Sequence, residues 1–226
     1  MKRKPVVALD GPAGSGKSTI AKLVAAKLGL HYLDTGAMYR SITLKALRTG
    51  TDTKNEAALT ALALSTKIDF VYGGEKLRVL MDGEDVTEAI RLPEVSKTSS
   101  DIADSIGVRK ELVKKQQELG LAGGVIIDGR DIGSLVFPDA EVKIYLDASV
   151  KERALRRFKE LEARGIKTGI GEVEKDICER DERDRSRPFG ALKKVPDAVV
   201  LDTTKMSILD VVERIVEIIK KNAKQL

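Results

Sequence analysis

Near its amino terminus the chain carries a glycine-rich loop that ends in a lysine and a serine. The segment Gly11-Pro12-Ala13-Gly14-Ser15-Gly16-Lys17-Ser18 matches the pattern G-x-x-x-x-G-K-[ST] at every fixed position. An apolar run at residues 6–9 precedes it, and apolar residues at helical spacing follow over residues 17–28. Glycines let the backbone turn its N–H groups toward phosphate oxygens, and a helix starting at the loop adds partial positive charge. The context therefore predicts a phosphate-binding loop rather than a glycine turn with a surface lysine.

The side chains in and near this loop predict how a nucleoside triphosphate and its metal ion are held. Lys17 is expected to reach the β- and γ-phosphates, and Ser18 offers a hydroxyl to Mg²⁺. Asp10 abuts the loop and Asp128 ends another apolar strand, so either carboxylate could hold a Mg²⁺-bound water. The alternative for Asp10 is an acid that caps local backbone. The residues of this segment predicted to bind ATP are Gly11, Pro12, Ala13, Gly14, Ser15, Gly16, Lys17, Ser18 and Thr19.

Strand-like and helix-like segments alternate along the rest of the chain. Further apolar strands are expected at residues 31–33, 124–127, 142–146 and 199–201, with helices at 36–47, 55–65, 93–103, 108–119, 149–164, 173–185 and 207–221. This order predicts an α/β P-loop NTPase fold with a parallel β-sheet core flanked by helices. Strand-like runs at 68–72, 77–81 and 84–86, with turn signals at Gly73-Gly74 and Asp82-Gly83, predict a small antiparallel insertion.

Composition narrows the class of protein. The chain has 226 residues, 42% hydrophobic and 33% charged, which is typical of a soluble globular protein. No apolar run approaches the ~20 residues of a membrane span, and the start does not resemble a secretory signal. Cys178 is the single cysteine and His31 the single histidine, so neither a disulfide within the chain nor a Cys/His nucleophile pair is expected. A single cysteine also suits the reducing environment of the cytoplasm. The net charge of +5 fits either an ordinary surface or an anionic ligand.

Two further segments carry residues suited to a phosphorylated acceptor. In residues 33–40, the Thr35 hydroxyl and the Arg40 guanidinium fit a small phosphate ester, although a helix cap and a surface arginine are the alternative. In residues 127–133, Arg130 can grip a phosphate, and the carboxylate of Asp131 can accept from the exocyclic amine of cytosine. A plain ion pair at a strand end is the alternative there.

A third segment, residues 179–187, is dense in arginine and acid. Helical spacing places Arg180, Arg183, Asp184 and Arg187 on one face, which could hold phosphates and a ribose hydroxyl, whereas Arg185 points elsewhere. Taken alone, such a charge run is typical of a solvated helix with i,i+4 ion pairs.

Together the three segments resemble the cytidylate kinase family, over nearly the whole chain from residue 6 to about 218. They are similar to the family patterns L-D-[ST]-G-x-x-Y-R, D-G-R-D-[MI]-G and E-R-D-x-R-D-R-x-R, with Thr35 where the family often has serine. The resemblance implies transfer of the γ-phosphate of ATP to CMP and also dCMP, with Mg²⁺, by a cytoplasmic monomer. It implies Lys17, Arg130, Arg180 and Arg187 as catalytic residues. The implied CMP-binding residues are Thr35, Arg40, Ser100, Arg109, Arg130, Asp131, Arg180, Asp184 and Arg187.

The resemblance also implies how the chain is organised. It indicates a single kinase domain over residues 1–226, with an acceptor-binding insertion at about 62–104 and a helical lid at about 150–187. Arg153 and Arg157 match a pair that touches ATP at the lid in related kinases, and surface ion pairs with Glu152 and Glu160 are the alternative.

Other functions remain as alternatives at this point. A P-loop kinase for UMP, AMP or a small metabolite would share the loop without requiring the arginine-rich face. A nucleotide-dependent switch would carry an N-K-x-D signal, which the sequence lacks. A nucleic-acid-binding protein is disfavoured because acids interleave with the arginines and aromatic residues make up 4% of the chain.

Overall fold

The computed structural model describes residues 4–73 and 76–223, so Gly74 of the expected Gly73-Gly74 turn lies outside the described residues. The chain divides into two compact units. The first unit comprises Met1–Leu33 and Gly120–Leu226, and the second comprises Asp34–Leu119.

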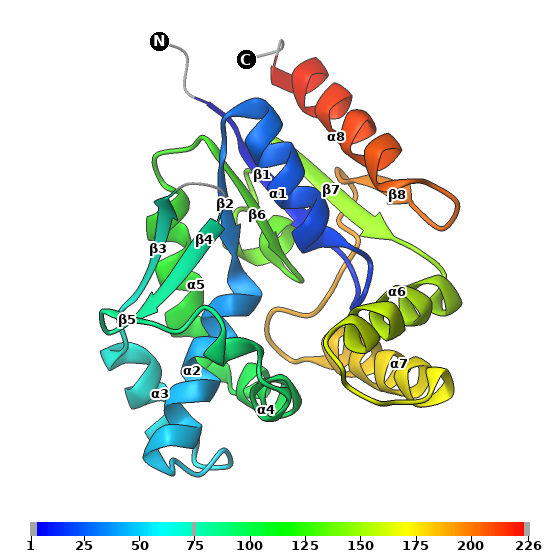
Figure 1. Cartoon of the computed structure of the whole chain (residues 1–226). Coiled ribbons are helices and arrows are strands. Elements are labelled where there is room, and N and C mark those ends of the chain that lie inside the picture. The colour runs from blue at the N-terminus through cyan, green and yellow to red at the C-terminus, as the bar shows by residue number, and fades with distance from the viewer. Residues whose placement is uncertain (1–3, 74–75, 224–226) are drawn as a thin grey trace. The chain divides into compact units, whose positions relative to one another are not determined.

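The first unit is built on a five-stranded sheet in the order β2-β6-β1-β7-β8 (Figure 1). Its strands are β1 (Val6–Asp10), β2 (His31–Asp34), β6 (Val125–Gly129), β7 (Val142–Asp147) and β8 (Val199–Asp202). Strand β1 pairs in parallel with β6 and β7, and β7 pairs in parallel with β8. All residues of β1 and β6 are buried, as expected for strands covered on both faces. The predicted parallel α/β core is confirmed.

Helices α1 (Lys17–Leu28) and α8 (Ile208–Ala223) pack against this sheet and against each other. Helix α1 ends at Gly29, whose φ of 61° is the left-handed conformation that closes a helix. A short π-helix, η2 (Ile132–Val136), follows β6 and contacts β1. The sequence pattern predicted no helix there.

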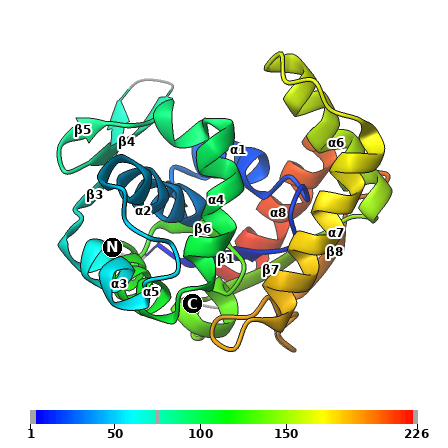
Figure 2. The ribbon, with the colours of Figure 1, turned by 90° about the horizontal axis from the view of Figure 1, so that it is seen from below.

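Helices α6 (Val150–Ala163) and α7 (Ile170–Ser186) lie side by side, as Figures 1 and 2 both show. The Ser149 hydroxyl accepts from the Glu152 N–H at 3.3 Å and so caps α6, as its sequence predicted. The two helices bury Ala154, Val173 and Ile177 between them. Helix α7 starts three residues before the predicted position, because the Glu172 side chain accepts from the Gly169 N–H at 3.0 Å and stabilises an earlier first turn.

The second unit contains helices around a small antiparallel sheet. Its elements are α2 (Thr35–Thr49), α3 (Glu56–Ser65), β3 (Ile68–Gly73), β4 (Lys76–Met81), β5 (Glu84–Asp85), η1 (Ala89–Arg91), α4 (Pro93–Asp104) and α5 (Ile106–Gly120), of which Gly120 belongs to the first unit. Strand β4 pairs antiparallel with β3 and β5, which confirms the predicted insertion. The core of this unit includes Met38, Ile42, Leu59, Ile102 and Leu112, all of them almost fully buried.

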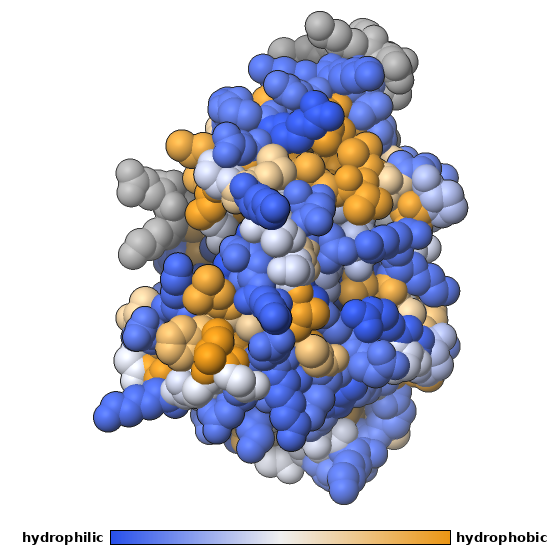
Figure 3. Space-filling view, turned by 90° about the vertical axis from the view of Figure 1, so that its right-hand side faces the viewer, coloured by the Kyte–Doolittle hydropathy of each residue, from blue (hydrophilic) through white to orange (hydrophobic). Residues whose placement is uncertain are grey.

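Figure 3 looks onto the side that carries α6, α7, β8 and α8. This surface is mostly hydrophilic, with apolar atoms in small groups. Val199 and Val200 of β8 and Leu209 of α8 contribute exposed apolar side chains. Among residues 4–73 and 76–223, no helix combines the length and apolar character required to span a bilayer.

Candidate active site

The glycine loop joins β1 to α1 in a conformation that requires its glycines. A Cβ on Gly11 would lie 2.1 Å from the backbone oxygen of Leu146, so no side chain fits there. Gly16 precedes the first turn of α1 with a φ of 89°, which L-residues with side chains rarely adopt. Sequence and structure therefore agree on a loop whose backbone lies close to the sheet and opens onto a helix N-terminus.

Lys17 lies inside the loop. Its Nζ donates to the backbone oxygen of Pro12 at 2.7 Å and to Ser15 Oγ at 3.2 Å. Burial, and then the nearby positive charge of Arg130, lower the pKa of Lys17 well below its ordinary value. A bound anion would offset both the burial of the Lys17 charge and its repulsion by Arg130, so this position of Lys17 suits an anionic ligand.

Ser18 and Asp128 face each other at the carboxyl end of the sheet. Ser18 Oγ donates to Asp128 Oδ2 at 2.6 Å, and the Tyr32 hydroxyl donates to Asp128 Oδ1 at 3.1 Å. Hydroxyl and carboxylate oxygens are the ligands that Mg²⁺ prefers, and Mg²⁺ keeps most of its water, so this pair fits the ion. Tyr32 was not predicted as a site residue.

Asp10 has a different environment. Its Oδ1 accepts from the Ile132 N–H at 2.9 Å and its Oδ2 from the Gly133 N–H at 2.7 Å. Burial raises the pKa of Asp10 from 3.8 to about 6, although the two N–H donors lower it in part. Both oxygens thus cap the first turn of η2, which is the backbone-capping alternative considered for this residue.

Arg130, Asp184 and Arg187 form one ion-pair cluster. Arg130 Nε donates to Asp184 Oδ2 at 2.7 Å, and Arg187 Nη1 lies 2.7 Å from Asp184 Oδ1. Burial raises the pKa of Asp184, but the positive charges of Arg130, Arg187 and Arg180 outweigh it and lower the pKa to about 2. The structure therefore brings together two of the sequence segments, with the carboxylate aligning two guanidinium groups. Arg187 follows α7, which ends at Ser186.

Asp131 is 5% exposed at the start of η2, next to Arg130.

The predicted pair on α6 separates in the structure. Arg153 is buried, donates from Nη1 to the Ala13 backbone oxygen at 2.9 Å, and lies 2.7 Å from Asp181 Oδ2. Arg157 instead pairs with Glu160 at 2.8 Å on the helix surface.

Sequence reasoning missed Arg156 and Asp181, which both contact the glycine loop. Arg156 Nη1 donates to the Ser15 backbone oxygen at 3.3 Å, and Asp181 Oδ1 accepts from the Ala13 N–H at 3.2 Å. The spacing of Arg156 from Arg153 is as helical as that of Arg157, so the pattern alone did not distinguish them.

Four predicted acceptor residues lie in the second unit. Arg40 Nη2 pairs with Asp34 Oδ2 at 3.2 Å, and Thr35 is buried at the start of α2. Arg109 is 2% exposed, donates to the Ala103 backbone oxygen at 3.2 Å and lies over the Tyr39 ring at 5.5 Å. Ser100 lies half-buried on α4.

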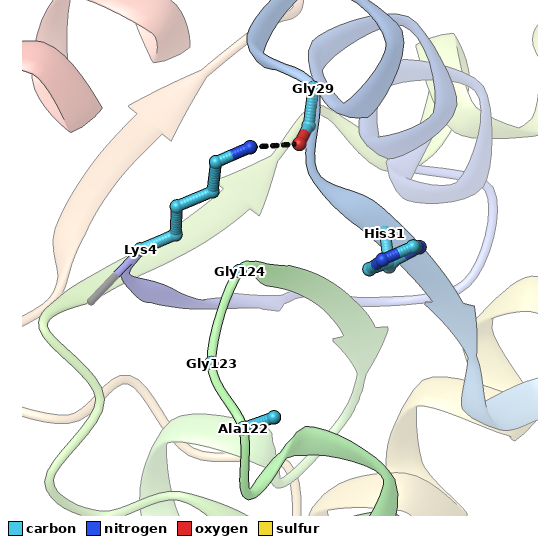
Figure 4. Close-up of a pocket in the computed structure, with 6 residues that line it drawn as sticks. All are labelled: Lys4, Gly29, His31, Ala122, Gly123 and Gly124. Atoms are coloured by element: carbon cyan, nitrogen blue, oxygen red, sulfur yellow. Dashed lines mark hydrogen bonds between the residues drawn. The ribbon is translucent and has the colours of Figure 1, made fainter. Parts of the chain in front are cut away.

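A separate pocket of about 200 Å³ lies at the opposite end of β1 from the glycine loop (Figure 4). Its lining residues are Lys4, Gly29, His31, Ala122, Gly123 and Gly124. Lys4 Nζ donates to the Gly29 backbone oxygen at 2.8 Å. Since the only histidine of the chain lines this pocket, it does not belong to the site around Lys17.

Comparisons with known proteins agree with the sequence patterns. A family model for cytidylate kinase matches residues 7–221. A cytidylate kinase of Bacillus pumilus (strain SAFR-032) is 50% identical over 225 residues, covering 100% of both chains. A bifunctional pantoate ligase/cytidylate kinase of Synechococcus sp. (strain JA-3-3Ab) is 47% identical and covers 97% of this chain and 41% of that protein.

Among solved structures, a gluconokinase from Sinorhizobium meliloti 1021 aligns over 100% of this chain and 97% of its own length, with a TM-score of 0.50 and 11% identity. This similarity bears on the fold alone. The family model over residues 7–221 and the full-length match at 50% identity show the family: the chain belongs to the cytidylate kinase family.

Proposed function

We propose that this protein transfers the γ-phosphate of ATP to CMP, and also to dCMP, giving ADP and CDP or dCDP. The observation that carries the proposal is the position of Arg130 directly after β6, because the end of β6 pairs with the end of β1 where the phosphate loop begins (Asp10 with Gly129), so that a cation for a second phosphate follows the neighbouring strand. Family membership supports the same reaction. We further propose a cytoplasmic monomer with one kinase domain, an acceptor insertion at about 62–104 and a lid at about 150–187.

The reaction requires mainly positioning and charge stabilisation. A phosphate acceptor already has a nucleophilic anionic oxygen at neutral pH, so no general base is essential. Lys17 would bind the β- and γ-phosphates, while Arg130, Arg180 and Arg187 would hold the acceptor phosphate and stabilise charge during transfer. Asp184 would keep Arg130 and Arg187 in place through its paired contacts.

Mg²⁺ would be held by Ser18, with Asp128 accepting from a metal-bound water. Ser18 Oγ and Asp128 Oδ2 lie 2.6 Å apart, and the Tyr32 hydroxyl donates a hydrogen bond to the other carboxylate oxygen of Asp128. When bound, the ion would neutralise phosphate charge. Asp10 is less suited, because both of its oxygens accept backbone hydrogen bonds.

Three residues are proposed to recognise the base. Asp131 would accept from the cytosine amine, and Ser100 and Arg109 would supply further contacts to the base. Thr35 and Arg40 would contact the acceptor, with Arg40 on its phosphate. Uracil presents a carbonyl where cytosine has its amine, so a hydrogen-bond acceptor such as the Asp131 carboxylate favours CMP over UMP.

The test is to compare acceptors in the unaltered protein and in Asp131→Asn. The unaltered protein is expected to use CMP in preference to UMP and AMP. The substitution should weaken CMP binding by about 10-fold or more, since a hydrogen bond to a charged group is worth about 1.5–3 kcal/mol, and should change ATP binding little. Isothermal titration of CMP, dCMP, UMP, AMP and ATP measures this. Unchanged CMP affinity would remove Asp131 from the base site, and preference for UMP or AMP would select the alternative kinase.

A further inference from the structure

The backbone of Ala13 in the phosphate loop is held on two sides by side chains from helices α6 and α7. Its N–H donates to Asp181 Oδ1 at 3.2 Å, and its carbonyl accepts from Arg153 Nη1 at 2.9 Å. The same Arg153 nitrogen lies 2.7 Å from Asp181 Oδ2. One residue of the loop is therefore joined to both helices through a single ion pair.

The pair is shielded from water. The side chains of Arg153 and Asp181 are 4% and 1% exposed. Arg153 Nε also donates to the Ala148 backbone oxygen at 2.9 Å, which fixes the guanidinium at the base of α6. A Cβ on Gly14 would lie 2.9 Å from the Arg153 backbone oxygen, so the loop and the start of α6 are already in close contact. A shift of the loop must therefore move this pair or break its contacts.

Helix α7 carries a second buried carboxylate three positions further on. Asp184 holds Arg130 and Arg187 at 2.7 Å each. The same buried side of α7 thus contacts the phosphate loop through Asp181 and aligns two arginines through Asp184.

We propose that Asp181 and Arg153 are positioning residues that couple occupancy of the phosphate loop to binding of the acceptor by the arginines on and around α7. A triphosphate in the loop repels the Asp181 carboxylate and attracts the Arg153 guanidinium, so the contacts with Ala13 differ in energy between the empty and the occupied loop. The inference rests on the proposed function for the identity of the two ligands.

The experiment measures this coupling by binding, without turnover. CMP is titrated into the protein alone and into the protein saturated with Mg²⁺ and a non-hydrolysable ATP analogue. In the unaltered protein we expect the analogue to tighten CMP binding by about fivefold or more, the lower end of typical coupling between sites.

Removing Asp181 alone would leave the buried Arg153 guanidinium without this counter-ion, and removing Arg153 alone would leave the buried Asp181 paired only with Arg185, 3.7 Å away; either change endangers folding. The variant is therefore Arg153→Met/Asp181→Leu, which replaces both charges with apolar side chains. The matched control is Lys175→Met/Glu179→Gln, which removes an exposed ion pair of 3.8 Å from the same helix.

In the double variant we expect the effect of the analogue on CMP affinity to fall to less than twofold, with CMP affinity in the absence of the analogue within threefold of the unaltered protein. The control should keep the full effect. Retained coupling in the double variant, or an equal loss of CMP affinity with and without the analogue, would overturn the proposal, as would absence of coupling in the unaltered protein. CDP formation, assayed separately, tests the proposed function, so the two failures are distinguishable.

Discussion

The burial of the single residue Asp10 makes the free energy of unfolding depend on pH. Its pKa of about 6 in the folded protein lies above the ordinary 3.8, so the folded state binds a proton more readily than the unfolded state. The free energy of unfolding must then fall as the pH rises between about 4 and 6. Above pH 6 the folded protein is destabilised by the full amount, about 3 kcal/mol for a shift of this size.

We expect Asp10→Asn to remove this dependence, because its side chain does not titrate. The difference in unfolding free energy, unaltered protein minus variant, should decrease by about 2 kcal/mol between pH 4 and pH 6.5. Urea unfolding at a series of pH values provides the measurement. If the free energy of unfolding depended on pH in the same way in the two proteins, Asp10 would have the same pKa in the folded and the unfolded state, which would contradict the prediction.

Single residues also show how far the sequence leads. Lys17, Ser18 and Asp128 could be placed at one site because a loop motif and a strand end fix their positions. Tyr32 and Asp181 could not, because their roles depend on partners 96 and 168 positions away in the chain. The sequence could not tell whether Asp10 helps to hold a metal ion or caps the backbone, because its backbone partners belong to η2, which the sequence did not predict.

At the scale of elements, the C-terminal end of α7 depends on the charge of Asp184. Its pKa of about 2 lies below the ordinary 3.8, so the carboxylate stabilises the folded state fully above about pH 4. That stabilisation, about 2.5 kcal/mol for such a shift, is lost as pH falls toward 2. The sign is opposite to that of Asp10.

We expect Asp184→Asn to destabilise the protein by about 3 kcal/mol at pH 7, since Arg130 and Arg187 lose their shared counter-ion. The deficit should shrink as pH falls below 4. Thermal unfolding at pH 7, 4 and 3 measures it, with Asp176→Asn on the exposed side of α7 as the control. A deficit that stays constant down to pH 3 would contradict the assigned pKa.

The α6–α7 pair is the element we expect to move when substrates bind. Its connection, residues 164–169, is mostly exposed, whereas Arg153 and Asp181 hold the base of the pair to the loop. Trypsin cleavage at Lys159, Arg164 and Lys167 should therefore slow when Mg²⁺, an ATP analogue and CMP are all present. Cleavage at Lys54, in the other unit, serves as an internal reference. Equal protection with and without nucleotides would argue against a lid at residues 150–187.

A sequence signal for the buried acids of α7 exists in hindsight. Val173, Ile177, Asp181 and Asp184 follow helical spacing, and all four are buried. Acids that continue the apolar side of a helix require partners inside the protein, because an unpaired buried charge is strongly destabilising. The charge-run interpretation placed Arg180, Arg183, Asp184 and Arg187 on one face, yet Arg180 and Arg183 are exposed while Asp184 is buried.

At the scale of the whole molecule, the alternation of apolar strands and helices was enough to predict the parallel sheet and the antiparallel insertion. The division into two units was not predicted, because the chain enters the second unit at Asp34, within β2, and leaves it within α5. No glycine- or proline-rich linker marks the first boundary, whereas Gly120, Gly123 and Gly124 follow the second. The predicted insertion and lid boundaries stay predictions.

The most direct test of the phosphotransfer proposal is to follow ATP, Mg²⁺ and CMP with this protein by ³¹P nuclear magnetic resonance. We expect the γ-phosphate signal of ATP to be lost as the β-phosphate signal of CDP grows in equal amount, with little inorganic phosphate, because positioned acceptor phosphate rather than water receives the group. Loss of ATP to inorganic phosphate alone, or no CDP while UMP or AMP is phosphorylated, would contradict the account.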